Sequence, residues 1–430
     1  MGFLLQLFVF LKPWLGSLSL DHFPFRDWKD VSVDTLLSTT LMGYVDAGFV
    51  LLTVIYLYWH REFLQLLPYR RLWFVFLGLL LIGSVVIAPA PLFALRRLVK
   101  VFVFFSMYAL TFVLVRKDPS YASGYLKWVV RSAWIPVVYG LGDFAANTEY
   151  SWAAISNREY REYSTFLHAN PFAYFCVVIL VVLAILWRFQ PETERPRRKW
   201  PLGLLAILLL LAIASTGARA AISGALVAYL FATRLSWRFK VATVCVATIV
   251  LLQVPNFSDP INAVGQVALG RQPTLTSAML DVVDQSDKDE FEHASELIGR
   301  VAIWINMTDG IRGYYLFGHG LDSSARFFER ETGLFLDSHN DYITLTFETG
   351  LSGLVLYWAI LIGIARLLFR QRRELARGSL PGHLADGALF LIVFLVVISL
   401  TDNLFVDIYS TPLIWSFLGA ATGNLVPKPA

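Results

Sequence analysis

Residues 337–353 contain the side chains of this chain that are best suited to chemistry. His339 stands directly before an apolar segment, and Ser338 with Asp341 has the spacing of a capping box at a helix start. A helix N-terminus carries free N–H groups and the positive end of the helix dipole, so it attracts anions such as phosphate. The same field disfavours an imidazolium ion, so His339 is predicted to be neutral and able to accept a proton. The alternative is that His339 only decorates a helix cap.

A polar stripe follows along the same predicted helix. Its members recur at helical spacing, which places them on one face: Asp341, Thr344, Glu348 and Ser352. Glu348 comes nine residues after His339, about 180° around an ideal helix. The two side chains are therefore not expected to share a face, and Asn340 and Glu348 are secondary candidates for the site.

Two arginines could hold an anion at the same place. Arg219 stands alone among small residues in the segment 214–224, which predicts a tight turn between closely packed helices. A lone arginine in so apolar a hairpin is costly unless it is paired, and the alternative is an arginine that snorkels to the membrane surface. Arg300 shares one face of a predicted amphipathic helix, residues 295–305, with Trp304. The alternative for Arg300 is a solvated surface side chain.

The composition assigns these residues to a membrane protein. Hydrophobic residues make up 57% of the 430 residues and charged residues only 16%, whereas a soluble domain carries roughly a quarter charged residues. No soluble core could bury so much apolar surface, so lipid is the expected solvent. The formal net charge of +4 is small and the basic residues are clustered, so nucleic acid is not an expected partner.

The expected fold is an all-α polytopic membrane protein with about twelve transmembrane helices. A span needs about 20 mostly apolar residues. The segments that meet this requirement are 2–20, 37–58, 72–90, 93–115, 122–142, 167–187, 201–216, 218–233, 239–254, 339–365, 386–401 and 405–425. The first span is predicted to be broken at Lys12-Pro13, because proline removes a helix hydrogen bond.

Basic residues predict the orientation of this bundle. With the N-terminus inside, Lys and Arg are concentrated in the inside segments, namely 59–71, 116–121, 188–200, 234–240 and 366–385. Both termini are therefore expected in the cytoplasm. The predicted division is a bundle over residues 1–254, a large helical extracytoplasmic loop over 255–338 and three further spans over 339–430.

This topology brings the three strongest candidates to one side of the membrane. Arg219, Arg300 and His339 all fall on the extracytoplasmic side. Two guanidiniums and a neutral imidazole suit a diphosphate leaving group and a hydroxyl nucleophile.

Other polar residues give weaker signals. Basic side chains on the outer side run against the general trend, where they either attract a lipid phosphate or form a basic cap: Arg96, Arg97 and Lys100. His168 lines the site or merely starts the sixth span. Asp287 and Asp289 imitate a metal-binding pair, but an acidic run is better explained as a solvated loop, so no metal site is expected. Asp46, in mid-span, needs a partner, and Asp402 is given no role.

The pattern resembles the O-antigen ligase family, within the group of O-antigen ligases, O-antigen polymerases and protein O-oligosaccharyltransferases. The resemblance covers about residues 160–360 and rests on these features: His339-Asn with Glu348-x-Gly350-x-x-Gly353, Tyr314-Tyr-Leu-Phe-Gly-His-Gly320, Gly299-Arg300 with Trp304, the Arg219 hairpin and Asn170-Pro171. One departure is Ala218, because a Ser or Thr is expected directly before the arginine.

The resemblance implies a glycosyl transfer at the periplasmic face of a Gram-negative inner membrane. The donor would be a glycan on undecaprenyl diphosphate, and the acceptor a sugar hydroxyl of lipid A–core oligosaccharide. Arg219 and Arg300 would hold the diphosphate and His339 would activate the hydroxyl, with no metal or other cofactor. An O-antigen polymerase is the nearest rival and a protein O-oligosaccharyltransferase the next. A transporter, the rival from another class, predicts two similar halves and a site near the bilayer midplane.

Overall fold

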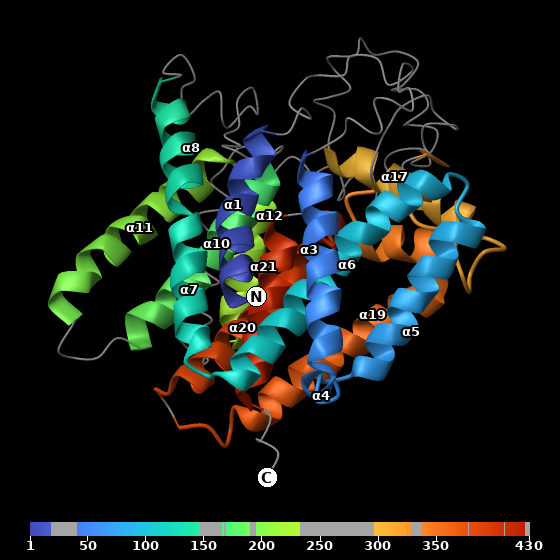
Figure 1. Ribbon diagram of the computed structural model, residues 1–430. Coiled ribbons are helices and arrows are strands. Elements are labelled where there is room, and N and C mark those ends of the chain that lie inside the picture. The colour runs from blue at the N-terminus through green and yellow to red at the C-terminus, as the bar shows by residue number, and fades with distance from the viewer. Residues whose placement is uncertain are drawn as a thin grey trace.

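The computed structural model describes residues 1–18, 41–146, 166, 169–189, 195–232, 296–324, 326–327, 338–376, 378–407 and 409–425. Helices and turns make up these residues, and no strand occurs among them. The predicted all-α class is therefore confirmed for the described part of the chain. Figure 1 shows the helices gathered into a bundle.

The described helices follow the apolar segments of the sequence. Their bounds are α1 Gly2–Leu18, α3 Leu41–Trp59, α4 Arg61–Leu64, α5 Arg70–Ile82 with the π-helix η3 Gly83–Ile87, α6 Pro91–Lys117, α7 Tyr121–Ser132, α8 Trp134–Ala146, α10 Ala169–Phe189, α11 Arg195–Ser215, α12 Arg219–Ala232, α17 Glu296–Gly310, α19 Asp341–Gln371, α20 Leu380–Ile398, the 3-10 helix η5 Leu404–Val406 and α21 Ser410–Leu425. The predicted amphipathic helix at 295–305 is confirmed as α17.

Five of the described helices are long and apolar enough to cross a membrane. They are Arg70–Ile87, α6, α10, α19 and α20, and shorter apolar helices occupy Gly2–Pro13, Gly43–Trp59 and Pro201–Ser215. The predicted fifth span, 122–142, consists of two successive helices, α7 and α8. The predicted ninth span, 239–254, and residues 255–295 of the predicted loop lie outside the described residues. The number of twelve spans stays a prediction.

The predicted break in the first span is wrong. Helix α1 continues through Pro13 to Leu18. Lys12 Nζ lies 2.5 Å from Asp46 Oδ1 of α3, and both side chains are buried. The ion pair supplies the partner that Asp46 was expected to need and ties α1 to α3 beside the proline.

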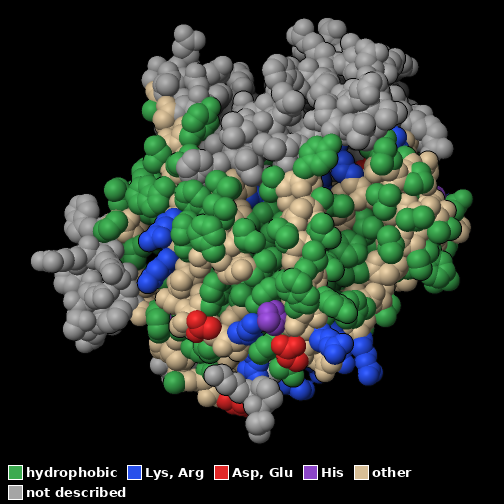
Figure 2. Space-filling model, viewed as in Figure 1, with side chains coloured by type: hydrophobic (Ala, Val, Ile, Leu, Met, Phe, Trp, Pro, Cys, Tyr) green, Lys and Arg blue, Asp and Glu red, His purple; other side chains and the backbone are tan. Residues whose placement is uncertain are grey.

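Apolar side chains remain exposed along the outer helices. Trp59 of α3 is 72% exposed, Val86 at the end of η3 is 76% exposed and Val355 of α19 is 62% exposed. Hydrophobic side chains cover most of the described surface in Figure 2 between its upper and lower ends. Exposed apolar patches of this extent are typical of a surface that faces lipid.

The interior is built on the close approach of α6 and α21. A Cβ atom added to Gly419 of α21 would lie only 2.3 Å from the carbonyl oxygen of Tyr108 on α6. Small residues that let helix backbones approach are typical of membrane bundles. Trp415 of α21 packs edge-on against Trp73 of α5, with ring centroids 4.9 Å apart.

The two ends of the bundle contain different connections between the helices. One end, called the basic end here, contains the connections at residues 59–70, 117–121 and 371–380. Lys117 Nζ lies 3.3 Å from His60 Nε2 at this end, and basic and acidic side chains gather at the lower end of the molecule in Figure 2. The opposite end, called the site end, contains the starts of α10, α12 and α19 and the end of α20. The basic end coincides with the segments that the sequence predicts to be cytoplasmic.

Helix α19 is interrupted at Gly350, whose φ of 67° and ψ of −177° are not helical. The segment 314–320 lies against the interruption, and its backbone groups form hydrogen bonds with the N–H and carbonyl groups of α19 that the interruption leaves without helical partners. Four hydrogen bonds join the two: His319 N to Phe347 O (2.9 Å), Gly320 N to Glu348 O (2.9 Å), Leu351 N to Tyr315 O (2.7 Å) and Ser352 N to Leu316 O (3.3 Å). A broken helix is tolerated at membrane depth because its freed backbone groups find such partners.

Glycines make this close contact possible. A Cβ atom on Gly350 would lie 2.3 Å from the carbonyl carbon of Leu316, and one on Gly318 would lie 2.5 Å from the carbonyl carbon of Glu348. Both glycines have positive φ angles, which residues with a Cβ rarely adopt. The glycine signatures of the two segments therefore belong to one structural feature.

Candidate functional site

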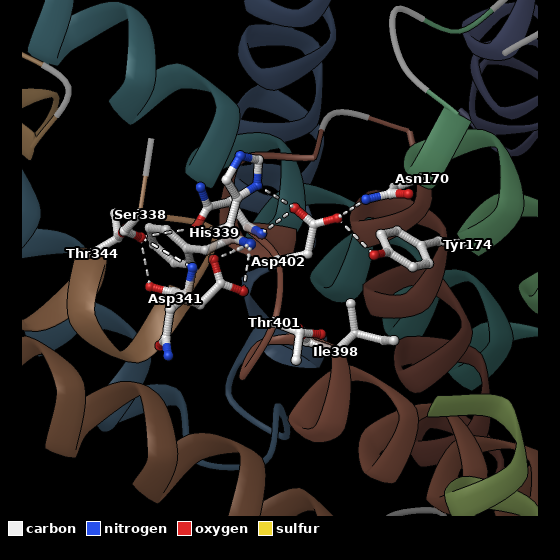
Figure 3. Close-up of polar contacts among 12 residues, drawn as sticks. Asn170, Tyr174, Ser338, His339, Asp341, Thr344, Ile398, Thr401 and Asp402 are labelled. Carbon is white, nitrogen blue, oxygen red and sulfur yellow. Dashed lines mark hydrogen bonds and ion pairs between the residues drawn. The ribbon is translucent and has the colours of Figure 1, made fainter. Parts of the chain in front are cut away.

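His339 lies at the site end, two residues before helix α19 begins. Its φ of 47° falls in the left-handed region, and its side chain is 40% exposed. The imidazole Nδ1 lies 3.2 Å from Oδ1 of Asp402, in the turn that follows α20 (Figure 3). The structure thus pairs His339 with a carboxylate 63 positions away in the sequence.

Asp402 is held from several directions. Its Oδ2 accepts hydrogen bonds from Asn170 Nδ2 and Tyr174 Oη, both at 2.7 Å, and its Oδ1 accepts one from the backbone N–H of Asn403 at 2.9 Å. Asn170 and Tyr174 lie on one side of α10, one helical turn apart (Figure 3). The carboxylate therefore links the start of α10 to the start of α19.

These contacts favour the ionised form of Asp402. Burial acts to raise the pKa of this carboxyl, but the hydrogen bonds from His339 and Tyr174 outweigh burial and hold the pKa below its usual range. The side chain is 13% exposed, so solvent screens these interactions only in part. The ionised carboxylate accepts hydrogen bonds only, which assigns the hydrogen of the neutral imidazole to Nδ1.

The pair has a definite chemical capacity. With its hydrogen on Nδ1, a neutral imidazole presents Nε2 as a proton acceptor, and an ionised Asp402 stabilises the imidazolium that forms when Nε2 takes up a proton. Serine proteases use the same arrangement of carboxylate, imidazole and hydroxyl. The partly exposed ring of His339 can therefore act as a general base towards a bound hydroxyl group.

The predicted capping box at the start of α19 is wrong. Asn340 is the N-cap, and its Oδ1 accepts hydrogen bonds from the N–H groups of Tyr342 (3.0 Å) and Ile343 (3.2 Å). Asp341 instead accepts hydrogen bonds from Ser399 Oγ at 2.7 Å and from the backbone N–H of Phe405. Asn340 is closer to the first free N–H groups, which leaves Asp341 to fasten the turn that carries Asp402.

The predicted polar stripe is also divided among different partners. Thr344 contacts the hydroxyl of Ser338, and Ser352 donates to the carbonyl oxygen of Leu316 beyond the break at Gly350. Glu348 accepts a hydrogen bond from Ser324 Oγ at 2.7 Å. The members of the stripe therefore have separate partners, and only Ser352 lies beyond the break at Gly350.

Arg97 lies with Glu348, away from His339. Its Nη1 lies 3.2 Å from Glu348 Oε1 and 3.5 Å from Asp322 Oδ1, and its side chain is 9% exposed. These carboxylates occupy the guanidinium, so Arg97 does not present a free charge to a lipid phosphate. Arg96, the neighbouring candidate on α6, is half-buried.

The helices that carry the two predicted anion-binding arginines meet the site end. Arg219 is the first residue of α12. Five positions later, Gly224 packs so closely on Ile398 that an added Cβ atom would lie 2.5 Å from the isoleucine Cδ1. Because Ile398 ends α20, the start of α12 lies at the same end of the bundle as Asp402.

Arg300 lies on α17, one helical turn before Trp304. Trp304 Nε1 donates a hydrogen bond to the carbonyl oxygen of Ser338 at 2.7 Å, so this face of α17 is fastened beside His339. The side chains of Arg219 and Arg300 lie outside the described part of the structure, as does His168. Among the described residues, no group of three or more His, Cys, Asp or Glu side chains could hold a metal ion.

No role is predicted from the sequence for two groups of this site, Asp402 and Tyr174. The available signal was modest: Asp402 begins the predicted outer turn between the last two spans, and Tyr174 lies one turn after Asn170 in the sixth span. Neither residue is close to His339 in the sequence.

A comparison with protein families now adds to this geometry. Residues 201–359 match the family model described as O-antigen ligase, a family of glycosyltransferase-like enzymes. The matched range contains Arg219, Arg300, His339 and the break at Gly350. The match supports an O-antigen ligase-type domain over residues 201–359, whereas Asn170 and Asp402 lie outside the matched range. A search of curated proteins finds no match to the chain.

Proposed function

We propose that this protein is an O-antigen ligase of the Gram-negative inner membrane. It transfers a glycan from undecaprenyl diphosphate to a sugar hydroxyl of lipid A–core oligosaccharide at the periplasmic face. The observation that carries the proposal is the pairing of His339 Nδ1 with Asp402 Oδ1 at 3.2 Å, with His339 inside the range that matches the O-antigen ligase family model. Such a pair is suited to the removal of a proton from a hydroxyl nucleophile.

The proposed reaction is a single displacement. His339 Nε2 takes the proton of the acceptor hydroxyl while the hydroxyl oxygen forms a bond to the anomeric carbon of the donor. The bond between that carbon and the diphosphate oxygen breaks, and undecaprenyl diphosphate leaves with the electron pair. Because the acceptor attacks from the face opposite the leaving group, the anomeric configuration inverts.

Arg219 and Arg300 are proposed to hold the diphosphate. A guanidinium matches phosphate oxygens with two parallel hydrogen bonds and stays charged at every physiological pH. Two such groups stabilise the charge that develops on the leaving diphosphate, so the proposed reaction needs no metal ion. The placement of α12 and α17 at the site end supports this role.

The arginines give a direct test. Arg219→Ala and Arg300→Ala are expected to abolish most transfer, and the Lys variants to restore only part, because an ammonium ion is a point charge without the planar fork. Arg312, which is exposed beyond α17, provides the control, since Arg312→Ala should leave transfer unchanged. Full activity of Arg219→Ala at equal protein level would remove that residue from the site.

An O-antigen polymerase is the second candidate, because it has the same donor chemistry and the family match does not separate the two activities. Deletion of the gene, followed by separation of lipopolysaccharide on a gel, distinguishes them. Loss of a ligase leaves core without polymer while lipid-linked polymer accumulates. Loss of a polymerase leaves core that carries one repeat unit, which would contradict the ligase proposal.

A further inference from the structure

The segment 314–317 is a run of large apolar side chains with unusual exposure. Tyr314 is 52% exposed, Tyr315 53%, Leu316 64% and Phe317 55%. The sequence places this segment in the predicted extracytoplasmic loop, where four such side chains in a row would face water. An exposed apolar patch marks a surface that contacts another apolar phase or partner.

The backbone of this segment is fixed to a membrane helix. The carbonyl oxygens of Tyr315 and Leu316 accept hydrogen bonds from Leu351 N and Ser352 N of α19, and Gly318 N donates to the carbonyl oxygen of Tyr314. His319 stacks between Tyr314 and Phe347, with ring centroids 4.0 Å and 4.4 Å away. The apolar side chains are therefore held outward by a rigid support.

The part of α19 after the break has the length of one membrane crossing. Residues 351–371 extend about 30 Å at 1.5 Å per residue, which equals the thickness of a hydrocarbon core. Arg370, Arg372 and Arg373 lie at the far end of this part, at the basic end of the bundle. The other boundary of the membrane consequently falls near Leu351, beside the segment 314–317.

The apolar surface is continuous from this segment onto the membrane helix. Leu351, whose N–H donates a hydrogen bond to the carbonyl oxygen of Tyr315, is 45% exposed. Val355 and Ile362 further along α19 are 62% and 50% exposed. Tyrosine rings are enriched at membrane–water boundaries because they combine an apolar ring with a polar hydroxyl. The partner that fits this surface is therefore lipid.

We propose that residues 314–317 form an interfacial anchor that inserts into the leaflet at the site end of the bundle. The tyrosines lie at head-group level, and Leu316 and Phe317 contact the upper part of the acyl chains. His319 Nε2 contacts the carbonyl oxygen of Gly310, the last residue of α17, at 2.8 Å. The anchor thereby holds α17 close to the membrane surface. Insertion of the anchor does not depend on the proposed glycosyl transfer.

The experiment measures the surroundings of residue 316 in a lipid bilayer. Cys176 and Cys245 are replaced by Ala, Leu316→Cys is labelled with an environment-sensitive fluorophore, and the full-length protein is placed in phospholipid nanodiscs. Quenching by lipids with a nitroxide on the acyl chain reports insertion, and quenching by iodide reports water. Val355→Cys provides the lipid-exposed control and Arg312→Cys the water-exposed control.

If the anchor inserts into the leaflet, the label at 316 should behave like the label at 355, with strong quenching by nitroxide lipids and protection from iodide. A label at 316 that behaves like the one at 312 would overturn it. If Leu316→Cys fails to give monodisperse protein, Phe317→Cys provides the same measurement, because its exposed side chain is also proposed to contact the acyl chains. Protection from both quenchers at 316 and 317 would also overturn the proposal, since it would mean that protein covers the segment.

Discussion

Two carboxylates lie near opposite ends of the first part of α19, and each has a basic partner. Asp402 lies beside His339 before the helix begins, and Glu348 lies beside Arg97 just before the break at Gly350. The first pair is open, since the imidazole is 40% exposed. The second is closed, since the side chains of Arg97 and Glu348 are 9% and 0% exposed.

This difference in exposure indicates that the open pair is suited to a reaction, whereas the closed pair stabilises the fold. A reacting group must meet its substrate, and only His339 in the open pair can do so. In the closed pair, burial makes the charges costly unless both are present, so each residue stabilises the other. The closed pair joins α6 to α19 just before the helix break, whereas the open pair is suited to proton transfer. Variants of the two pairs should therefore fail in different ways.

The largest effect is expected from the open pair. His339→Ala removes the proposed base, and transfer should fall about 10²–10⁴-fold while the lipid-linked donor still binds. His60→Ala, at the basic end, is the control and should leave the rate unchanged. Rates and donor binding measured on purified protein in nanodiscs test this expectation. Wild-type transfer by His339→Ala would remove the histidine from the reaction.

A change in the closed pair is expected to lower the stability of the protein. Arg97→Met leaves Glu348 buried without its guanidinium, which is expected to cost about 3–5 kcal/mol of unfolding free energy. Arg97→Met combined with Glu348→Leu should recover much of the loss, because the fully buried carboxylate is removed together with the guanidinium. Thermal unfolding in detergent measures both. If Arg97→Met lost transfer while its melting temperature stayed at the wild-type value, Arg97 would have a role in the reaction.

Asp402→Asn tests whether the charge of this carboxylate supports the proposed proton transfer by His339. The amide no longer stabilises an imidazolium, so transfer is expected to fall about 10²-fold, with donor affinity retained. The control is Asp118→Asn, because Asp118 caps a turn at the basic end. Unchanged transfer by Asp402→Asn would mean that the carboxylate has only a structural role.

The stability that the Asp402→Asn variant loses is expected to depend on pH. The pKa of Asp402 is held below its usual range in the folded protein. Its contribution to stability is therefore present above the unfolded pKa of about 4 and is lost as the pH falls towards the folded pKa. Asp402→Asn lacks this contribution at every pH. The difference in melting temperature between the two proteins should shrink below about pH 4, and a constant difference would contradict the favoured ionisation.

The smallest effect is expected at the contact between Gly350 and the segment 314–320. Gly350→Ala adds a Cβ at a positive φ, where it meets the carbonyl carbon of Leu316, and should destabilise the protein by about 1–3 kcal/mol. Gly313 also has a positive φ, but nothing lies within 4 Å of an added Cβ. Gly313→Ala therefore measures the backbone strain alone. Equal melting temperatures for the two variants would show that the clash at the break is relieved without cost.

The sequence predicts the local features of this molecule well. Apolar segments of suitable length indicated most of the described helices, and the helical spacing at 295–305 indicated α17. The position of His339 before a helix was also predictable, because the polar run changes there into an apolar one. The N-cap was misplaced, since Ser338 and Asn340 are both good caps and only the buried contacts of Asp341 decide between them.

Contacts across the bundle were not predictable from the sequence. The partner of His339 is 63 positions away, and the partner of Glu348 lies on another helix. The break at Gly350 was hidden because the residues around it form a normal helical pattern. Its physical cause is the segment 314–320, which supplies hydrogen bonds from outside the helix.

The rate of transfer as a function of pH tests the central claim, that the Asp402-oriented His339 acts as a general base. Purified wild-type protein and His339→Ala are compared in nanodiscs with lipid-linked donor and lipid A–core acceptor. The wild-type rate should fall as the pH is lowered through the range where imidazoles take up a proton, and the much slower variant should lack this fall. A wild-type rate that rises as the pH is lowered would instead mean that an imidazolium holds phosphate, and it would contradict the general-base role.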